Sequence, residues 1–120
     1  LSKAWETGAE YIALYPNVLL GVHRDHIFSV VLQPVSKDFT LERVNIFYAS
    51  SESISKDYDK LRKENFSFWK SVLSEDIFVV EGMQKGRYGN FFDGGRFSPA
   101  MDGPTHNFHG WVANQFLGSN

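Results

Sequence analysis

The sequence predicts an α+β fold in which an antiparallel sheet is followed by one long helix packed on it. The first half alternates apolar and polar residues between short turns, which is typical of strands. Residues 54–81 contain neither proline nor glycine, which favours a helix. Hydrophobic residues make up 42% of the 120 residues and charged residues 22%, so a packed core is expected and disorder is not.

Four strands are expected in the first half, at residues 11–15, 18–22, 27–35 and 39–48. Turn residues separate them at positions 16–17, 24–25 and 36–38. Because connections this short join neighbouring strands, the sheet is predicted to be antiparallel. Pro34 has no backbone N–H to donate, so it marks the end of its strand or an edge of the sheet.

The fourth predicted strand, residues 39–48, has two distinct faces. One carries Leu41, Arg43, Asn45 and Phe47, and the other carries Thr40, Glu42, Val44, Ile46 and Tyr48. We expect Asn45 and Phe47 to line a substrate pocket. A register slip of one residue would exchange the two faces, so this expectation depends on the register.

The second half is expected to hold two helices joined by a loop. The long helix begins among the N-cap candidates at residues 51–55 and ends at Gly82 or Gly86, with an internal break left open. Residues 85–104, rich in glycine and aromatic residues, predict an ordered loop laid over the domain. Pro104 starts a final helix at residues 105–117, and its apolar face comprises Phe108, Trp111, Val112, Gln115 and Phe116.

Asp76 is the residue of the long helix that a simple apolar face does not explain. On a helical wheel, one stripe contains Tyr58, Leu61, Asn65, Phe68, Val72, Asp76, Val79 and Met83. A carboxylate on a core-facing stripe is costly unless it is paired or bound to a metal. Asp76 is therefore a candidate metal ligand or catalytic acid or base. The alternative is a helix that breaks near Ser74 and leaves Asp76 in solvent.

Charge and cysteine content exclude several classes of function. The net charge of −2 and the pI near 6.1 do not favour nucleic acid or an anionic membrane as a partner, and no apolar run is long enough to span a bilayer. The chain contains no cysteine, so disulfides, a thiolate nucleophile and a cysteine-bound iron–sulfur cluster within it are excluded. We expect a cytoplasmic protein. Leu1 in place of a starting methionine suggests a fragment.

Several segments in order resemble the α subunits of Rieske-type ring-hydroxylating oxygenases. The segment SEDIFVVEGMQKG at residues 74–86 resembles the E-D-x-x-x-x-E-x-x-Q-x-G helix of that family. The segments GRFSP at 95–99 and HNFHGWV at 106–112 resemble its C-terminal pattern, and YPNVLL at 15–20 with Asp25–His26 resembles its P-N strand and D-H turn. The resemblance covers nearly the whole chain.

The resemblance implies a helix-grip fold (START/Bet v 1-like), a curved antiparallel sheet wrapped around a long helix. It also implies a mononuclear Fe(II) held by two histidines and one aspartate, and the aspartate corresponds to Asp76. Electrons would come from NAD(P)H through a reductase or ferredoxin and a Rieske [2Fe–2S] cluster, usually in a homotrimer. The reaction implied is mono- or dioxygenation by O₂ of a small aromatic or quaternary-ammonium molecule.

The chain departs from the family pattern in what it lacks. It has no cysteine for the Rieske cluster, and the family's segment carrying the two iron histidines is not present. Residues 1–120 are therefore expected to be the C-terminal portion of the oxygenase catalytic domain, to supply one iron ligand of three, and to be inactive alone. Both ligand histidines and the cluster would lie outside this chain.

The chain's own histidines form two pairs, His23 with His26 and His106 with His109. Two histidines without further ligands are a weak metal signal, so structural roles are expected for both pairs. Two other functions remain open. One is a non-catalytic helix-grip domain that binds a hydrophobic small ligand, and the other is a fragment whose role is packing against upstream sequence.

Overall fold

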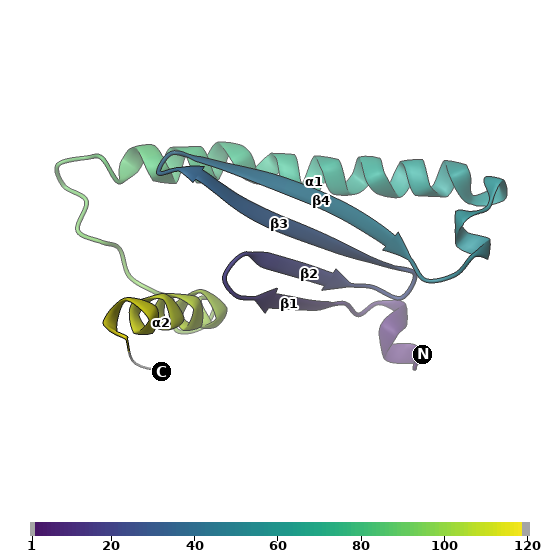
Figure 1. The fold of residues 1–120 in the computed structure, drawn as a ribbon, viewed down its shortest axis with the longest axis horizontal. Helices are drawn as coiled ribbons and strands as arrows, with labels where there is room; N and C mark the ends of the chain where they lie inside the picture. Colours follow the sequence, from purple (N-terminus) through teal and green to yellow (C-terminus); the bar gives the residue numbers. More distant parts are fainter. Residues whose placement is uncertain (1, 119–120) are drawn as a thin grey trace. The chain divides into compact units, whose positions relative to one another are not determined.

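The computed structural model describes residues 2–118 and confirms the α+β class. Four strands precede the helices: β1 (Glu10–Leu14), β2 (Val18–Val22), β3 (His26–Ser36) and β4 (Phe39–Tyr48). Two helices follow, α1 (Asp59–Gly86) and α2 (Gly103–Leu117). Figure 1 shows this order from the purple N-terminal end to the yellow C-terminal helix. A four-stranded antiparallel sheet with a long helix and a short C-terminal helix is consistent with the helix-grip prediction.

The sheet is a meander in which every strand pairs with its neighbour in sequence, in the order β1-β2-β3-β4. All three pairings are antiparallel, as predicted. The peptide bond between Tyr15 and Pro16, in the turn between β1 and β2, is cis. Pro34 does not end its strand, but it lies beyond the part of β3 that pairs with β2, so it stands at an edge, as the alternative predicted. The register with β4 also shifts between Pro34 and Ser36.

The core lies on the face of the sheet that carries Phe28 and Val30 of β3. These two side chains and Trp69 of α1 are buried together, and Leu32, Ile46, Val72 and Leu73 pack around them at partial burial. Gly21 of β2 lies opposite Phe28, and a Cβ at this position would overlap the Phe28 ring. The absence of a side chain at Gly21 therefore leaves the space that Phe28 occupies in the core.

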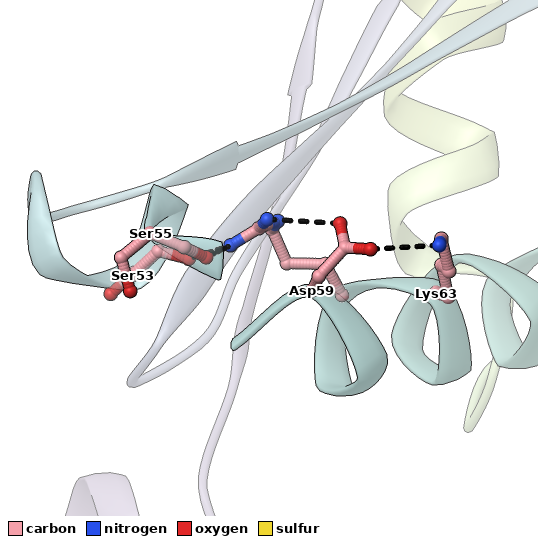
Figure 2. A network of polar contacts seen from close by, with 5 residues as sticks. Ser53, Ser55, Asp59 and Lys63 are labelled. Atoms are coloured by element: carbon pink, nitrogen blue, oxygen red, sulfur yellow. Dashed lines mark hydrogen bonds and ion pairs between the residues drawn. The ribbon is translucent and has the colours of Figure 1, made fainter. Parts of the chain in front are cut away.

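Helix α1 begins later than the sequence predicted. Two short 3-10 turns, η2 (Glu52–Ile54) and η3 (Lys56–Tyr58), occupy the expected first turns, and α1 starts at Asp59. Arg62 fixes this entry. Its guanidinium donates to the backbone carbonyls of Ser53 and Ser55 and pairs with Asp59 at 3.1 Å. Figure 2 shows this network, in which Lys63 also reaches Asp59 at 2.7 Å.

The predicted apolar stripe of α1 was wrong in its centre. Trp69 is the residue of α1 that is buried, whereas its neighbour Phe68, which the wheel placed on the stripe, is 60% exposed. Asn65 and Val72 are half-buried as expected, but Leu61 and Val79 are exposed. Phe66, Phe68 and Trp69 are all aromatic and lie within four positions, so their hydrophobicity does not indicate which of the three faces the core.

The chain divides into two compact units, one up to Glu81 and one from Gly82 onward. In the second unit, Pro104 lies in the first turn of α2, as predicted, and Asp102 is the N-cap. The helix ends at Leu117, and the next residue, Gly118, adopts the left-handed conformation. Phe108, Trp111 and Val112 are half-buried, but Phe116 of the predicted apolar face is 89% exposed. No helix within residues 2–118 has the length and hydrophobicity needed to cross a bilayer.

Candidate metal-ligand site

Asp76 lies within an unbroken helix. Helix α1 is continuous from Asp59 to Gly86, so the break considered near Ser74 does not occur. Asp76 follows the buried Trp69 by seven residues and the half-buried Leu73 by three, which places it on the same side of the helix. Its side chain is nevertheless exposed, because the core ends at Val72 and Leu73.

The Asp76 carboxylate is free to accept a ligand. Among the described residues it has no hydrogen-bond or ion-pair partner that would occupy its oxygens. No group of three or more His, Cys, Asp or Glu side chains able to hold a metal occurs within residues 2–118. Within residues 2–118, a single exposed carboxylate is therefore what this part of α1 offers to a metal ion or another ligand.

A series of hydrogen bonds joins α1 to the sheet, buried at Trp69 and His26 and ending at the exposed Asp25. The indole Nε1–H of Trp69 donates to Nε2 of His26 at 2.8 Å, and both residues are only 8% exposed. Since an indole nitrogen can only donate, Nε2 of His26 carries no proton in this arrangement. Nδ1 then bears the hydrogen and donates to Oδ1 of Asp25, also at 2.8 Å. This fixes one tautomer of His26.

His23 completes the cluster from the end of β2. Its ring stacks on that of His26 with centroids 4.7 Å apart and meets the Trp69 ring edge-on at 5.2 Å. Burial, followed by the charge interaction with His26, lowers the pKa of His23, and Asp25 opposes this. For Asp25, burial acts to raise the pKa, but the hydrogen bond with His26 and the remaining interactions outweigh it and the pKa is lowered.

The second histidine pair lies apart from this cluster in the chain. His106 and His109 of α2 both meet the Phe97 ring edge-on, with centroids 5.2 Å and 5.1 Å away. These contacts agree with the structural role expected for the pair. The structural role expected for His23 and His26 agrees with their aromatic packing and with the hydrogen bond to Trp69.

Asn45 and Phe47 lie on the face of β4 opposite the core residue Ile46, and Phe47 is 56% exposed. A groove of about 710 Å³ runs between β4 and the first half of α1. Its lining comprises Val44, Asn45, Ile46, Phe47, Tyr48, Arg62, Lys63, Phe66 and Ser67. A role for Asn45 and Phe47 in substrate binding stays a prediction.

Sequence reasoning missed the Trp69–His26 hydrogen bond, which spans 43 positions along the chain. The Asp25–His26 segment was noted as a turn, but no local pattern indicates that a tryptophan in the helix would meet it. The tryptophan itself was the only signal, because a buried indole N–H usually finds an acceptor.

The fold and the free carboxylate define an α+β domain in which one long helix presents an acid beside the helix–sheet core. The sequence model of the family described as ring hydroxylating alpha subunit (catalytic domain) matches residues 2–118. The chain therefore belongs to the family of ring-hydroxylating oxygenase α subunits and represents sequence of their catalytic domain. Neither curated proteins nor solved structures gave a significant match.

Proposed function

We propose that this chain forms the C-terminal portion of an oxygenase catalytic domain and that Asp76 is the carboxylate ligand of its mononuclear Fe(II). The observation that carries the proposal is the free Asp76 carboxylate, on the Trp69 side of α1, in a chain that matches the oxygenase family over residues 2–118. Two histidines from outside residues 1–120 would complete a facial triad, which leaves coordination positions open.

Such an iron, when bound, supplies the activation of O₂ for insertion into a substrate. This chain's contribution is electrostatic and geometric. The carboxylate offsets part of the metal's charge, and the continuous helix presents it from a rigid element. Electrons would reach the site from NAD(P)H through a reductase or ferredoxin and a Rieske [2Fe–2S] cluster outside this chain, in a homotrimer.

The proposed substrate is a small aromatic or quaternary-ammonium molecule. The groove between β4 and α1 offers aromatic side chains, Tyr48 and Phe66, next to the cations of Arg62 and Lys63. Aromatic rings suit either substrate type, since they stack on aromatic molecules and attract quaternary cations.

The test is the iron content of the intact α subunit that carries this chain, compared between the wild type and Asp76→Ala. We expect the variant to lose the mononuclear iron and O₂-dependent turnover while it keeps the [2Fe–2S] cluster. Glu75→Ala is the matched control, because Glu75 is also an exposed carboxylate and its neighbour on α1. It should keep both metals.

Unchanged iron and turnover in Asp76→Ala would show that Asp76 is not a ligand. In that case a non-catalytic domain that binds a hydrophobic ligand becomes the better explanation of the fold. Equal loss of iron in Glu75→Ala and Asp76→Ala would indicate a general effect of charge on this helix and would also contradict the proposal.

A further inference from the structure

The attachment of α1 to the sheet depends on very few side chains. Trp69 is the residue of α1 that is buried, and only Val72 and Leu73 add partial apolar packing to the core from the same helix. Packing by three apolar side chains selects this face of the helix but leaves some freedom to rotate about the helix axis. A directional contact restrains that rotation further.

The hydrogen bond from Trp69 to His26 is that directional contact. It is 2.8 Å long and buried. If it were broken, the indole N–H and the imidazole nitrogen would be left buried without hydrogen-bond partners, which costs free energy. His26 is itself held from two sides, by its hydrogen bond to Asp25 and by stacking on His23. The acceptor atom is therefore presented in one fixed direction.

The position of Trp69 determines that of Asp76. Seven residues separate them, which in an α-helix is a rise of about 10 Å and a net rotation of only about 20°. A helix displaced by one residue would rotate every side chain by about 100° and turn the carboxylate away from its present side. Any interaction that fixes the rotation of α1 at Trp69 thus also fixes the direction of Asp76.

We propose that Trp69 and His26 are positioning residues that orient the Asp76 carboxylate for the iron. The inference rests on the proposed function of Asp76. Neither residue touches the metal in this proposal. They act through the helix, by setting its rotation and its position along the sheet. Groups hydrogen-bonded directly to a metal ligand change metal affinity by about 10- to 100-fold when they are replaced, and residues that act through the helix should fall at the lower end of that range.

The experiment measures mononuclear iron per [2Fe–2S] cluster in the intact subunit, so that folded protein is the reference and activity is not required. We expect Trp69→Phe and His26→Phe, which keep an aromatic ring but remove the hydrogen bond, to bind this iron about 10-fold more weakly. His26→Gln should restore most of the affinity, because its side-chain oxygen can still accept from the indole N–H.

Val30→Ala is the matched control. It removes packing from the same core as Trp69 but takes no part in the hydrogen bond, so it should lower the unfolding midpoint and leave the iron content unchanged. If Trp69→Phe does not fold, the comparison of His26→Phe with His26→Gln decides the question, since only the former loses the acceptor.

The outcomes separate this inference from the proposed function. Loss of iron in Asp76→Ala, with full retention in both Trp69→Phe and His26→Phe, would overturn the positioning role alone. The same would follow if Val30→Ala lost as much iron as these variants, or if His26→Gln were no better than His26→Phe. Retention of iron in Asp76→Ala would overturn both the proposed function and this inference.

Discussion

His23 is a histidine whose pKa the fold lowers. Its Nε2 is buried without a hydrogen-bond partner among the described residues, and its pKa is lowered from the ordinary value of 6.5 by burial and then by His26. The groups that face it are Tyr11 on β1, Trp69 on α1, and Asp25 and His26 in the adjoining turn and strand. Of these, Asp25 is the one that favours the charged form.

The lowered pKa of His23 predicts a pH dependence of stability. Below pH 6.5 the unfolded chain binds a proton at His23 that the folded chain resists, so stability should fall as the pH drops from 6.5 through the folded pKa. Urea unfolding of the intact subunit across this window should show a smaller fall for His23→Phe than for the wild type. An equal fall in both would contradict the assignment to His23.

At the same scale, Asp76 shows what a sequence can indicate about a single residue. The periodicity of the helix marked it as an unusual acid, and the family motif at residues 74–86 assigned it a role independently. The structure places it on the side predicted but in solvent, because a wheel shows direction and not where the core ends. Its role as an iron ligand stays a prediction until the iron content is measured.

The connection from β4 to α1 gives a prediction at the scale of the element. Arg62 holds the carbonyls of Ser53 and Ser55 and the carboxylate of Asp59, and its side chain is 21% exposed. Arg62→Ala should therefore lower the free energy of unfolding by about 1.5–3 kcal/mol, the range for hydrogen bonds to charged groups. Chemical denaturation of the intact subunit measures this.

Lys60→Ala is the control for Arg62→Ala. Lys60 pairs with Glu64 at 3.7 Å on the same helix, but its side chain is 87% exposed. Such a pair contributes about 0.5 kcal/mol or less. A similar loss of stability in the two variants would mean that Arg62 acts only as another surface charge and does not fix the helix entry.

Strands were predicted more accurately than helix boundaries and faces. The bounds of β2 and β4 agree with the prediction to the residue, because apolar alternation ends at strong turn residues on both sides. The start of α1 was misplaced, since the serines at residues 51–55 suit 3-10 turns as well as an N-cap. Its buried face depends on contacts with β3, and those are not encoded in the helix alone.

At the scale of the whole molecule, the described residues expose much apolar surface. Phe78 on α1, Phe91 in the loop and Phe116 on α2 are 82%, 99% and 89% exposed. Large apolar side chains exposed to this extent are candidates for contact with other protein. The prediction that residues 85–104 form a loop laid over the domain stays untested, and under the proposed function other protein of the α subunit would cover part of this surface.

The exposed apolar surface predicts how residues 1–120 behave alone. The isolated chain should bind a hydrophobic dye such as ANS and associate with itself, and it should hold no iron if, as proposed, it supplies one ligand of three. Dye fluorescence, light scattering and metal analysis measure these properties. Phe78→Ser should reduce the dye binding. A monomer that unfolds cooperatively and binds no dye would contradict the expectation that more protein covers this surface.

The central position of Trp69 in α1 also makes the helix a lever. Trp69 is the point at which α1 is held on the sheet, and Asp76 lies about 10 Å further along the helix. A tilt of about 5° at that point would move the carboxylate by about 0.9 Å over that distance. Metal–ligand distances tolerate only about 0.2 Å. Small motions of the helix on the sheet would therefore be amplified at Asp76, and the Trp69–His26 hydrogen bond together with the packing of Val72 and Leu73 would oppose them.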